Sequence, residues 1–283
     1  MKARERTLEA DMKQGLLVIL AVVVVSGVAG VAAAQDTLSR PDWSAIFSPD
    51  GKVVDLKGGL DAFFLEDKVS DGVGLDMSAI APAEKPTVDN ALVDAANDLA
   101  NGYVYAAKDP SGDLQIYAGV ERFDSTTDTY VEFEFYQDLV QVQGGAPWLI
   151  HGDRKQNDAL VRVNFVGGQL SSATFKRWDG SAYQTVATVA ADGGSECSGT
   201  DYLVCSGQPP VPPISDEAWD AAGTAVTVPE PNAFVEIGFN VSVLLGSQVE
   251  FTSLQVRTPQ DIILDGFRRL GHWAQGAKRG GRR

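Results

Sequence analysis

The sequence predicts an all-β protein, a two-sheet antiparallel β-sandwich of jelly-roll-like topology, behind an N-terminal signal or transmembrane helix. Three observations carry this prediction. From residue 102 onward, apolar and polar residues alternate with a period of two, which indicates strands with one buried face. Gly, Pro, Asn and Asp recur between these segments as turn signals. Residues 16–25 are entirely apolar, as in a segment that enters a membrane.

The N-terminal segment has the layout of an export signal. Residues 14–35 contain no charged side chain, Lys13 precedes them, and three alanines at 32–34 offer a site for signal peptidase. Met12 gives a cleaner start than Met1, because the residues before it mix basic with acidic side chains. The alternative is a retained anchor, since an uncharged run of about 20 residues is long enough to span a bilayer.

The chain is expected to have four parts. These are a signal peptide at 1–34, a loosely patterned N-terminal segment of the sandwich at 35–100, the sandwich body at 101–265 and a basic flexible tail at 266–283. Residues 35–265 hold 35 Asp and Glu against 13 Lys and Arg. This acidity argues against nucleic acid as a partner, because phosphate binding needs a clustered basic surface. The tail is either a frayed terminus or a contact with an anionic wall polymer or lipid headgroup.

The strands follow one another from residue 102. Residues 102–107 and 114–122 are expected to form a hairpin around the turn at 109–112, where Pro110 presets φ and Gly112 accepts a positive φ. Residues 130–137 give the clearest strand, with Val131, Phe133 and Phe135 on one face. Further strands are expected at 159–165, 173–178, 184–189, 234–244, 248–256 and 262–264.

Two cysteines, Cys197 and Cys205, lie in a Gly- and Ser-rich stretch. In an exported chain this spacing indicates a local disulfide that closes one loop. A redox pair is not favoured, because the spacing is not C-x-x-C.

Two carboxylates and three aspartates are candidates for chemistry. Glu132 and Glu134 share one strand face roughly 7 Å apart, a spacing compatible with a glycoside hydrolase. Their simpler interpretation is a solvated or rim face of a sheet in an acidic protein. Asp67, Asp71 and Asp76 could ligate Ca²⁺ through oxygen, although no defined calcium loop is present and turn formation explains them as well.

Aromatic residues suggest a ligand surface. Trp148 and Trp178 could stack on sugar rings if they share a face, and core packing is the alternative.

Several segments occur in an order typical of one bacterial module. They are a strand that ends in Glu-Arg, an F-E-F strand, D-x-L-V-x-x-x-F, a Gly-Gly turn, Arg-Trp and E-x-x-x-N-[LV], at 114–122, 130–137, 158–165, 167–168, 177–178 and 234–241. Over about residues 100–260 the chain therefore resembles a β-rich module of uncharacterised bacterial secreted and cell-surface proteins. The resemblance implies an extracellular location and a β-rich fold, and it assigns no functional residue.

The expected function is a secreted bacterial surface-type protein with a non-enzymatic, structural or adhesion-like role. One alternative is a carbohydrate-binding sandwich stabilised by Ca²⁺, and a second is a glycoside hydrolase that uses Glu132 and Glu134. The expected partners are an extracellular glycan or a cell-wall polymer, with membrane contact only through an uncleaved N-terminal segment. No cofactor is expected other than Ca²⁺ in the first alternative.

Overall fold

The structure is a computed structural model that describes residues 37–47, 53, 61–66, 87–88, 94, 97–122, 126–143, 148–190, 198–207 and 234–270. All of them belong to the compact unit Asp36–Arg283. The predicted signal segment, the tail beyond residue 270 and the three aspartates Asp67, Asp71 and Asp76 lie outside the described residues. Among the helices that are described, none combines the length and the apolar character needed to cross a membrane.

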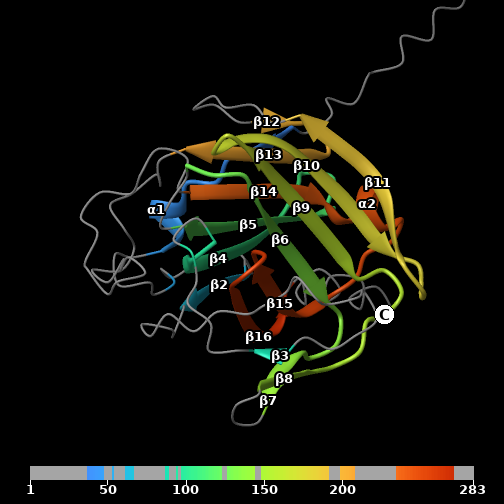
Figure 1. Ribbon diagram of the computed structural model, residues 1–283. Coiled ribbons are helices and arrows are strands. Elements are labelled where there is room, and N and C mark those ends of the chain that lie inside the picture. The colour runs from blue at the N-terminus through green and yellow to red at the C-terminus, as the bar shows by residue number, and fades with distance from the viewer. Residues whose placement is uncertain are drawn as a thin grey trace, which may run out of the picture. The chain divides into compact units, whose positions relative to one another are not determined.

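Six strands form the larger sheet, in the order β11-β10-β9-β6-β15-β16, and all its pairs are antiparallel (Figure 1). Five strands form the second sheet, in the order β13-β14-β5-β4-β2, also antiparallel. The strands of the six-stranded sheet are β6 (Thr129–Tyr136), β9 (Ala159–Val166), β10 (Gln169–Trp178), β11 (Tyr183–Ala190), β15 (Phe251–Arg257) and β16 (Ile262–Leu270). Those of the five-stranded sheet are β2 (Asp61–Glu66), β4 (Leu99–Lys108), β5 (Leu114–Arg122), β13 (Tyr202–Gly207) and β14 (Phe234–Asn240).

Shorter elements accompany the two sheets. The strand β1 (Leu38–Ser39) pairs with β12 (Ser198–Gly199), and β8 (Trp148–His151) lies between β3 (Thr87–Val88) and β7 (Gln141–Gln143). The two described helices are α1 (Trp43–Ile46) and α2 (Val241–Leu245).

The main core lies between the two sheets. Alternate residues of each strand point into it, among them Phe133 and Phe135 from β6 and Ile237 and Phe239 from β14, all without exposed surface. The rings of Phe135 and Phe239 meet across the sheets at 5.4 Å between centroids. Because each fully buried side chain of this size contributes about 2 kcal/mol, this layer supplies the main driving force for folding. The expected all-β antiparallel sandwich is confirmed.

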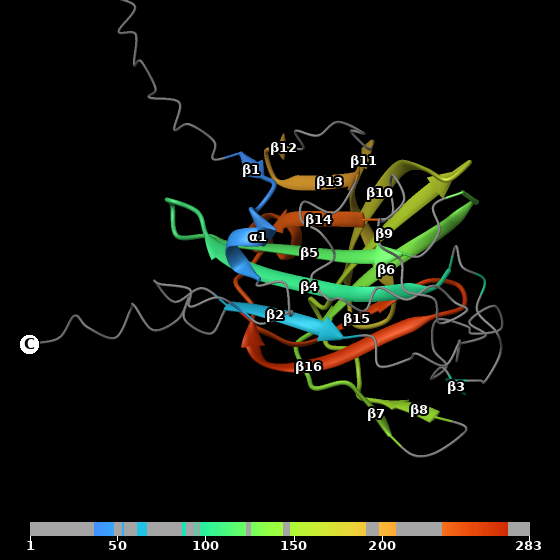
Figure 2. The ribbon, with the colours of Figure 1, turned by 90° about the vertical axis from the view of Figure 1, so that its left-hand side faces the viewer.

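A second apolar cluster covers the outer face of the five-stranded sheet. Figure 2 shows α1 in front of this sheet. Trp43 and Phe47 pack there against Tyr103 of β4 and Phe234 of β14, with Trp43 only 1% exposed. Gly119 of β5 makes room for this packing, because a Cβ at that position would approach the Phe234 ring to 2.5 Å. The N-terminal residues 37–47 therefore seal one face of the sandwich.

The expected hairpin of residues 102–122 is confirmed as the pair β4 and β5. The expected strand at 234–244 is wrong in its second half, since β14 ends at Asn240 and α2 follows. The Asn240 side chain accepts a hydrogen bond from the Val243 backbone N–H at 3.3 Å, and Gly246 ends the helix at φ 72°. Asn and Gly are favoured at these two cap positions, which explains the single helical turn.

Candidate functional site

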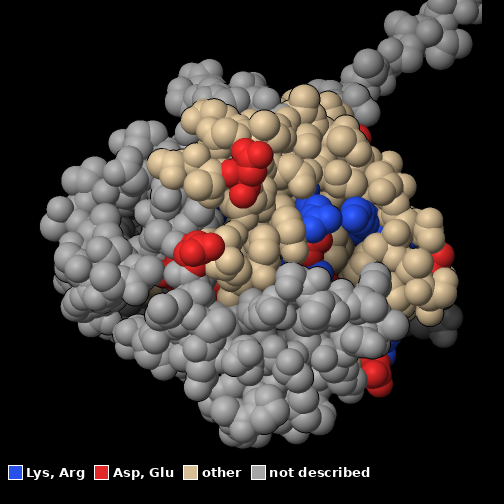
Figure 3. Space-filling view, viewed as in Figure 1, with Lys and Arg blue, Asp and Glu red and all other residues tan. Residues whose placement is uncertain are grey.

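The outer face of the six-stranded sheet, which points away from the main core, carries an array of charged and aromatic side chains. Alternation along β6 places Glu132 and Glu134 on this face. The strand register sets Arg162 of β9 and Arg257 of β15 opposite Glu132 on its two sides. Figure 3 looks onto this face and shows basic and acidic side chains meeting at a hollow.

Glu134 is completely enclosed by its partners. Arg154, from the loop between β8 and β9, donates from Nε at 2.5 Å and from Nη2 at 3.2 Å, and the Tyr183 hydroxyl donates at 2.5 Å. Burial opposes ionisation, but the charge and hydrogen bonds of Arg154 outweigh it and lower the pKa of Glu134. The same contact raises the pKa of Arg154, against the opposing effect of its own burial. Glu134 is thus a fixed carboxylate and a poor proton donor.

Glu132 lies between two arginines. The Arg162 Nε is 3.2 Å from Glu132 Oε1, and the Arg257 Nε donates to Oε2 at 2.6 Å. The guanidinium of Arg162 also lies 3.8 Å from the centre of the Tyr130 ring, a cation–π contact. The interpretation of Glu132 and Glu134 as a solvated strand face is wrong, because their side chains are 6% and 0% exposed. Neighbouring strands supply the cations for Glu132, and the loop before β9 supplies the cation for Glu134, which makes the burial of both possible.

An aromatic pair lies beside Glu134. Trp178 at the end of β10 faces Tyr183 at the start of β11, with ring centroids 5.1 Å apart in an edge-on arrangement. The Arg154 guanidinium lies 5.5 Å from the Trp178 ring and 5.6 Å from the Tyr183 ring. Both aromatic side chains are partly exposed. Burial, followed by the charge of Glu134, raises the pKa of Tyr183, so its hydroxyl stays a donor.

A tight turn holds this aromatic pair together. The Asp179 carboxylate accepts hydrogen bonds from the backbone N–H groups of Ser181 and Ala182, both at 2.8 Å, and Gly180 adopts φ 107°. These bonds lower the pKa of Asp179 to about 2. Asp followed by Gly is the local sequence signal for such a turn. The turn joins β10 to β11 and sets Trp178 opposite Tyr183.

A buried aspartate holds the loop that carries Arg154. Asp158 has no exposed surface and accepts from the backbone N–H of Gln137 at 3.0 Å and of Lys155 at 2.7 Å. Burial raises the pKa of Asp158 despite these hydrogen bonds. The loop after β8 is therefore tied to the end of β6, the strand that carries Glu134.

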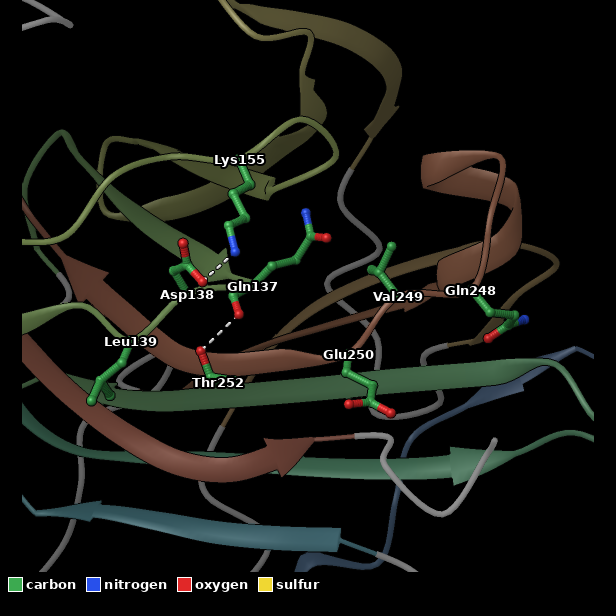
Figure 4. Close-up of a pocket in the computed structure, with 8 residues that line it drawn as sticks. All are labelled: Gln137, Asp138, Leu139, Lys155, Gln248, Val249, Glu250 and Thr252. Carbon is green, nitrogen blue, oxygen red and sulfur yellow. Dashed lines mark hydrogen bonds and ion pairs between the residues drawn. The ribbon is translucent and has the colours of Figure 1, made fainter. Parts of the chain in front are cut away.

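A shallow depression lies at the same end of the sheet (Figure 4). Its volume is about 520 Å³. Lys155 and Asp138 form an ion pair on one side of it, and Thr252 donates to the Gln137 carbonyl at 3.0 Å. The remaining lining residues are Leu139, Gln248, Val249 and Glu250. The two contacts thus engage four of its eight lining residues.

The structure describes only some of the other candidate residues that the sequence suggested. Trp178 lies in the aromatic pair, whereas Trp148 lies on β8 in the three-stranded sheet and its side chain is outside the described residues. Cys205 is buried in β13 and is not a free thiol, but Cys197 is outside the described residues, so their pairing stays a prediction. Within the described part of the chain, no group of three His, Cys, Asp or Glu side chains is placed to hold a metal ion.

Sequence reasoning missed four members of the array: Arg154, Arg162, Tyr183 and Arg257. The signal for Arg162 was its place between Val161 and Val163, which alternation assigns to the face opposite the core. Its pairing with Glu132 required the strand register, which the sequence does not specify. Arg154 lies in a loop and carried no periodic signal.

Comparison with known proteins gives no match: no family model fits the chain, and no curated protein or solved structure is similar to it.

Proposed function

We propose that this chain is an exported bacterial surface protein of adhesion type, without enzymatic activity, that binds an extracellular glycan on the outer face of its six-stranded sheet. The observation that carries the proposal is the partly exposed Trp178 and Tyr183 pair, held rigid by Arg154 and Glu134. Aromatic rings on an extended sheet present flat apolar surfaces on which sugar rings stack, while neighbouring polar groups fix orientation. Rigid side chains lose little entropy on binding.

The paired carboxylates favour binding over hydrolysis. A glycoside hydrolase needs one carboxyl group with a raised pKa as the acid and a second as base or nucleophile. Here Glu134 has a lowered pKa and accepts hydrogen bonds from Arg154. Glu132 accepts a hydrogen bond from Arg257 and forms an ion pair with Arg162. Neither carboxylate is arranged to donate a proton to a leaving group.

Export and the finer features of the fold belong to the same proposal. The uncharged residues 14–35 support export, with cleavage after Ala34 or retention as an anchor. The chain passes between the two sheets from β5 to β6, from β11 to β13 and from β14 to β15, and such crossings support a jelly-roll-like topology. A disulfide between Cys197 and Cys205 suits an oxidising location.

A glycan array with the purified protein tests the binding function. Wild type is expected to bind at least one glycan class, and Trp178→Ala is expected to weaken that binding about tenfold or more. Val243→Ala, which changes an exposed apolar side chain on α2, serves as the matched control. Absence of binding to every glycan by the folded wild type removes the proposal.

Two further arms separate the alternatives. Binding that is lost in EDTA favours the calcium-stabilised form of the site, and binding unchanged by EDTA removes that form. Hydrolysis of the bound glycan by wild type, abolished by Glu134→Gln, would establish the hydrolase alternative instead.

A further inference from the structure

We infer that the glycan bound by this face is an acidic polysaccharide, recognised through its carboxylate groups by Arg162, Lys176 and Arg257. The inference rests on the proposed function and names the chemical class of its ligand. It follows from how the charges of the face are layered, from where the cations gather and from what surrounds them.

The acids of this face lie beneath the cations. The side chains of Glu132 and Glu134 are 6% and 0% exposed, whereas those of Arg162 and Arg257 are 35% and 17% exposed. A ligand that approaches from solvent therefore meets guanidinium groups first. Buried carboxylates that accept from the inner edge of a guanidinium hold it in one orientation, as supporting residues do in a preorganised binding site.

Arg162 and Lys176 have more N–H donors than their contacts with the described residues use. Arg162 makes one ion pair within the described residues, through Nε, and stacks on Tyr130. A guanidinium has five N–H donors in a planar fork that matches a carboxylate. Lys176 of β10 forms no ion pair with any residue that the structure describes. The register places Lys176 opposite Leu160, two residues along β10 from Thr174, which lies opposite Arg162. Among the described residues of this array, the four cations Arg154, Arg162, Lys176 and Arg257 thus accompany the two buried carboxylates.

This local excess stands against the charge of the whole chain, which is −15. Figure 3 shows basic side chains gathered at the hollow, with the more exposed acidic side chains away from it. A positive region in an acidic protein attracts an anionic polymer to that region alone, since the remaining surface repels it.

One acid, Asp179, directly follows Trp178 at the aromatic end, five residues along the chain from Thr174, which lies opposite Arg162. Asp179 is bonded within the β10–β11 turn. Arg162 is paired with Thr174, four residues along β10 from Trp178, which is roughly 13 Å at the rise of a strand. An extended polysaccharide can therefore stack one sugar on Trp178 and place a carboxylate of a sugar further along near Arg162. The spacing fits a polymer better than a single sugar.

Binding of polygalacturonate at low and high salt tests the inference, with dextran as the neutral glycan. Wild type is expected to bind polygalacturonate more tightly and to lose affinity as salt rises. Arg162→Gln together with Lys176→Gln is expected to reduce this affinity about tenfold or more, because charge-assisted hydrogen bonds are lost. Dextran binding, where present, is expected to stay unchanged. In the double variant Glu132 still has Arg257 as a partner, so we expect the fold to be retained. Circular dichroism of the variant checks this expectation.

Lys108→Gln on β4 is the matched control, since it removes one positive charge from the other sheet. Unchanged polygalacturonate binding by the double variant overturns the assignment to this face. Binding of neutral glycans alone, sensitive to Trp178→Ala, overturns the acidic class and keeps the proposed function, whereas binding of no glycan overturns both. Equal affinity for polyphosphate overturns carboxylate recognition in favour of general anion attraction.

Discussion

Each sheet of the sandwich carries two buried glutamates on its outer face, but different kinds of residue cover and pair with these glutamates on the two faces. On the five-stranded sheet, Glu121 accepts from Asn101 and Tyr103, and the N-terminal residues 37–47 cover Glu236. On the six-stranded sheet, Glu132 and Glu134 are held by arginines from neighbouring strands and a loop. One face is closed by residues 37–47, which bring the apolar side chains of Trp43 and Phe47 together with Arg40. The other face is closed mainly by arginines, which remain partly exposed.

The two faces also differ in the pKa values of their buried glutamates. Burial raises the pKa of Glu121, and it raises that of Glu236 to about 7, even with Arg40 and Trp43 as partners. The arginine Arg154 lowers the pKa of Glu134. A carboxylate that is buried mainly under apolar side chains therefore destabilises the folded protein when it is ionised. A carboxylate that is buried under arginines stays ionised and holds the arginine side chains in place. The first face serves folding, and we assign recognition to the second.

The largest effect is expected from opening the covered face. Trp43→Ala removes a side chain that packs against Phe47, Tyr103 and Phe234 and donates to Glu236 at 2.5 Å. Loss of a buried Trp costs about 3–5 kcal/mol, so the free energy of unfolding in urea is expected to fall by that amount. Trp178→Ala, on the other face, is the comparison and is expected to cost far less. Equal losses from both substitutions contradict the division into a covered and an open face.

A pH titration of stability sharpens the contrast. Folded Glu236 has a pKa of about 7 against an unfolded value of 4.5, so between these values the folded protein binds the extra proton. Stability is therefore greatest below pH 4.5 for this group and is lost as pH rises to 7, by about 3 kcal/mol. Glu236→Gln is expected to remove this slope from urea unfolding curves. Other groups contribute too, so the diagnostic is the difference between variant and wild type across this window.

A smaller effect is expected from breaking one arginine contact. Glu134→Gln leaves Arg154 without its carboxylate, and a loss of about 2 kcal/mol is expected, since the Arg154 side chain is 26% exposed and part of the charge is solvated. Adding Arg154→Gln is expected to restore part of this loss, because the uncompensated charge is gone. Thermal unfolding of the two single variants and the double variant measures the coupling. Additive losses would show that the contact is energetically unimportant.

The strands with strict alternation could be read from the sequence, and the faces they form could not. The residues of β6 and the β4–β5 hairpin were predictable because apolar side chains recur there at every second position. The burial of Glu132 and Glu134 depends on pairing of β6 with β9 and with the distant β15, and on Arg154 from a loop. The cover formed by residues 37–47 has no period at all. Trp178 could be named from its residue type, and Asp179 followed by Gly180 is a local sequence signal for the turn after it.

The position of β6 between β9 and β15 has a consequence for how the chain folds. Glu132 is paired with Arg257, 125 residues downstream, so the central strand has no second neighbour until nearly the whole chain exists. β5 likewise obtains its second neighbour, β14, only after residues 234–240 have been synthesised. Pairings of such long range make folding slow, because loops must close before contacts compensate for the lost chain entropy. The two central strands, β5 and β6, therefore obtain both of their neighbours only after β14 and β15 have been synthesised.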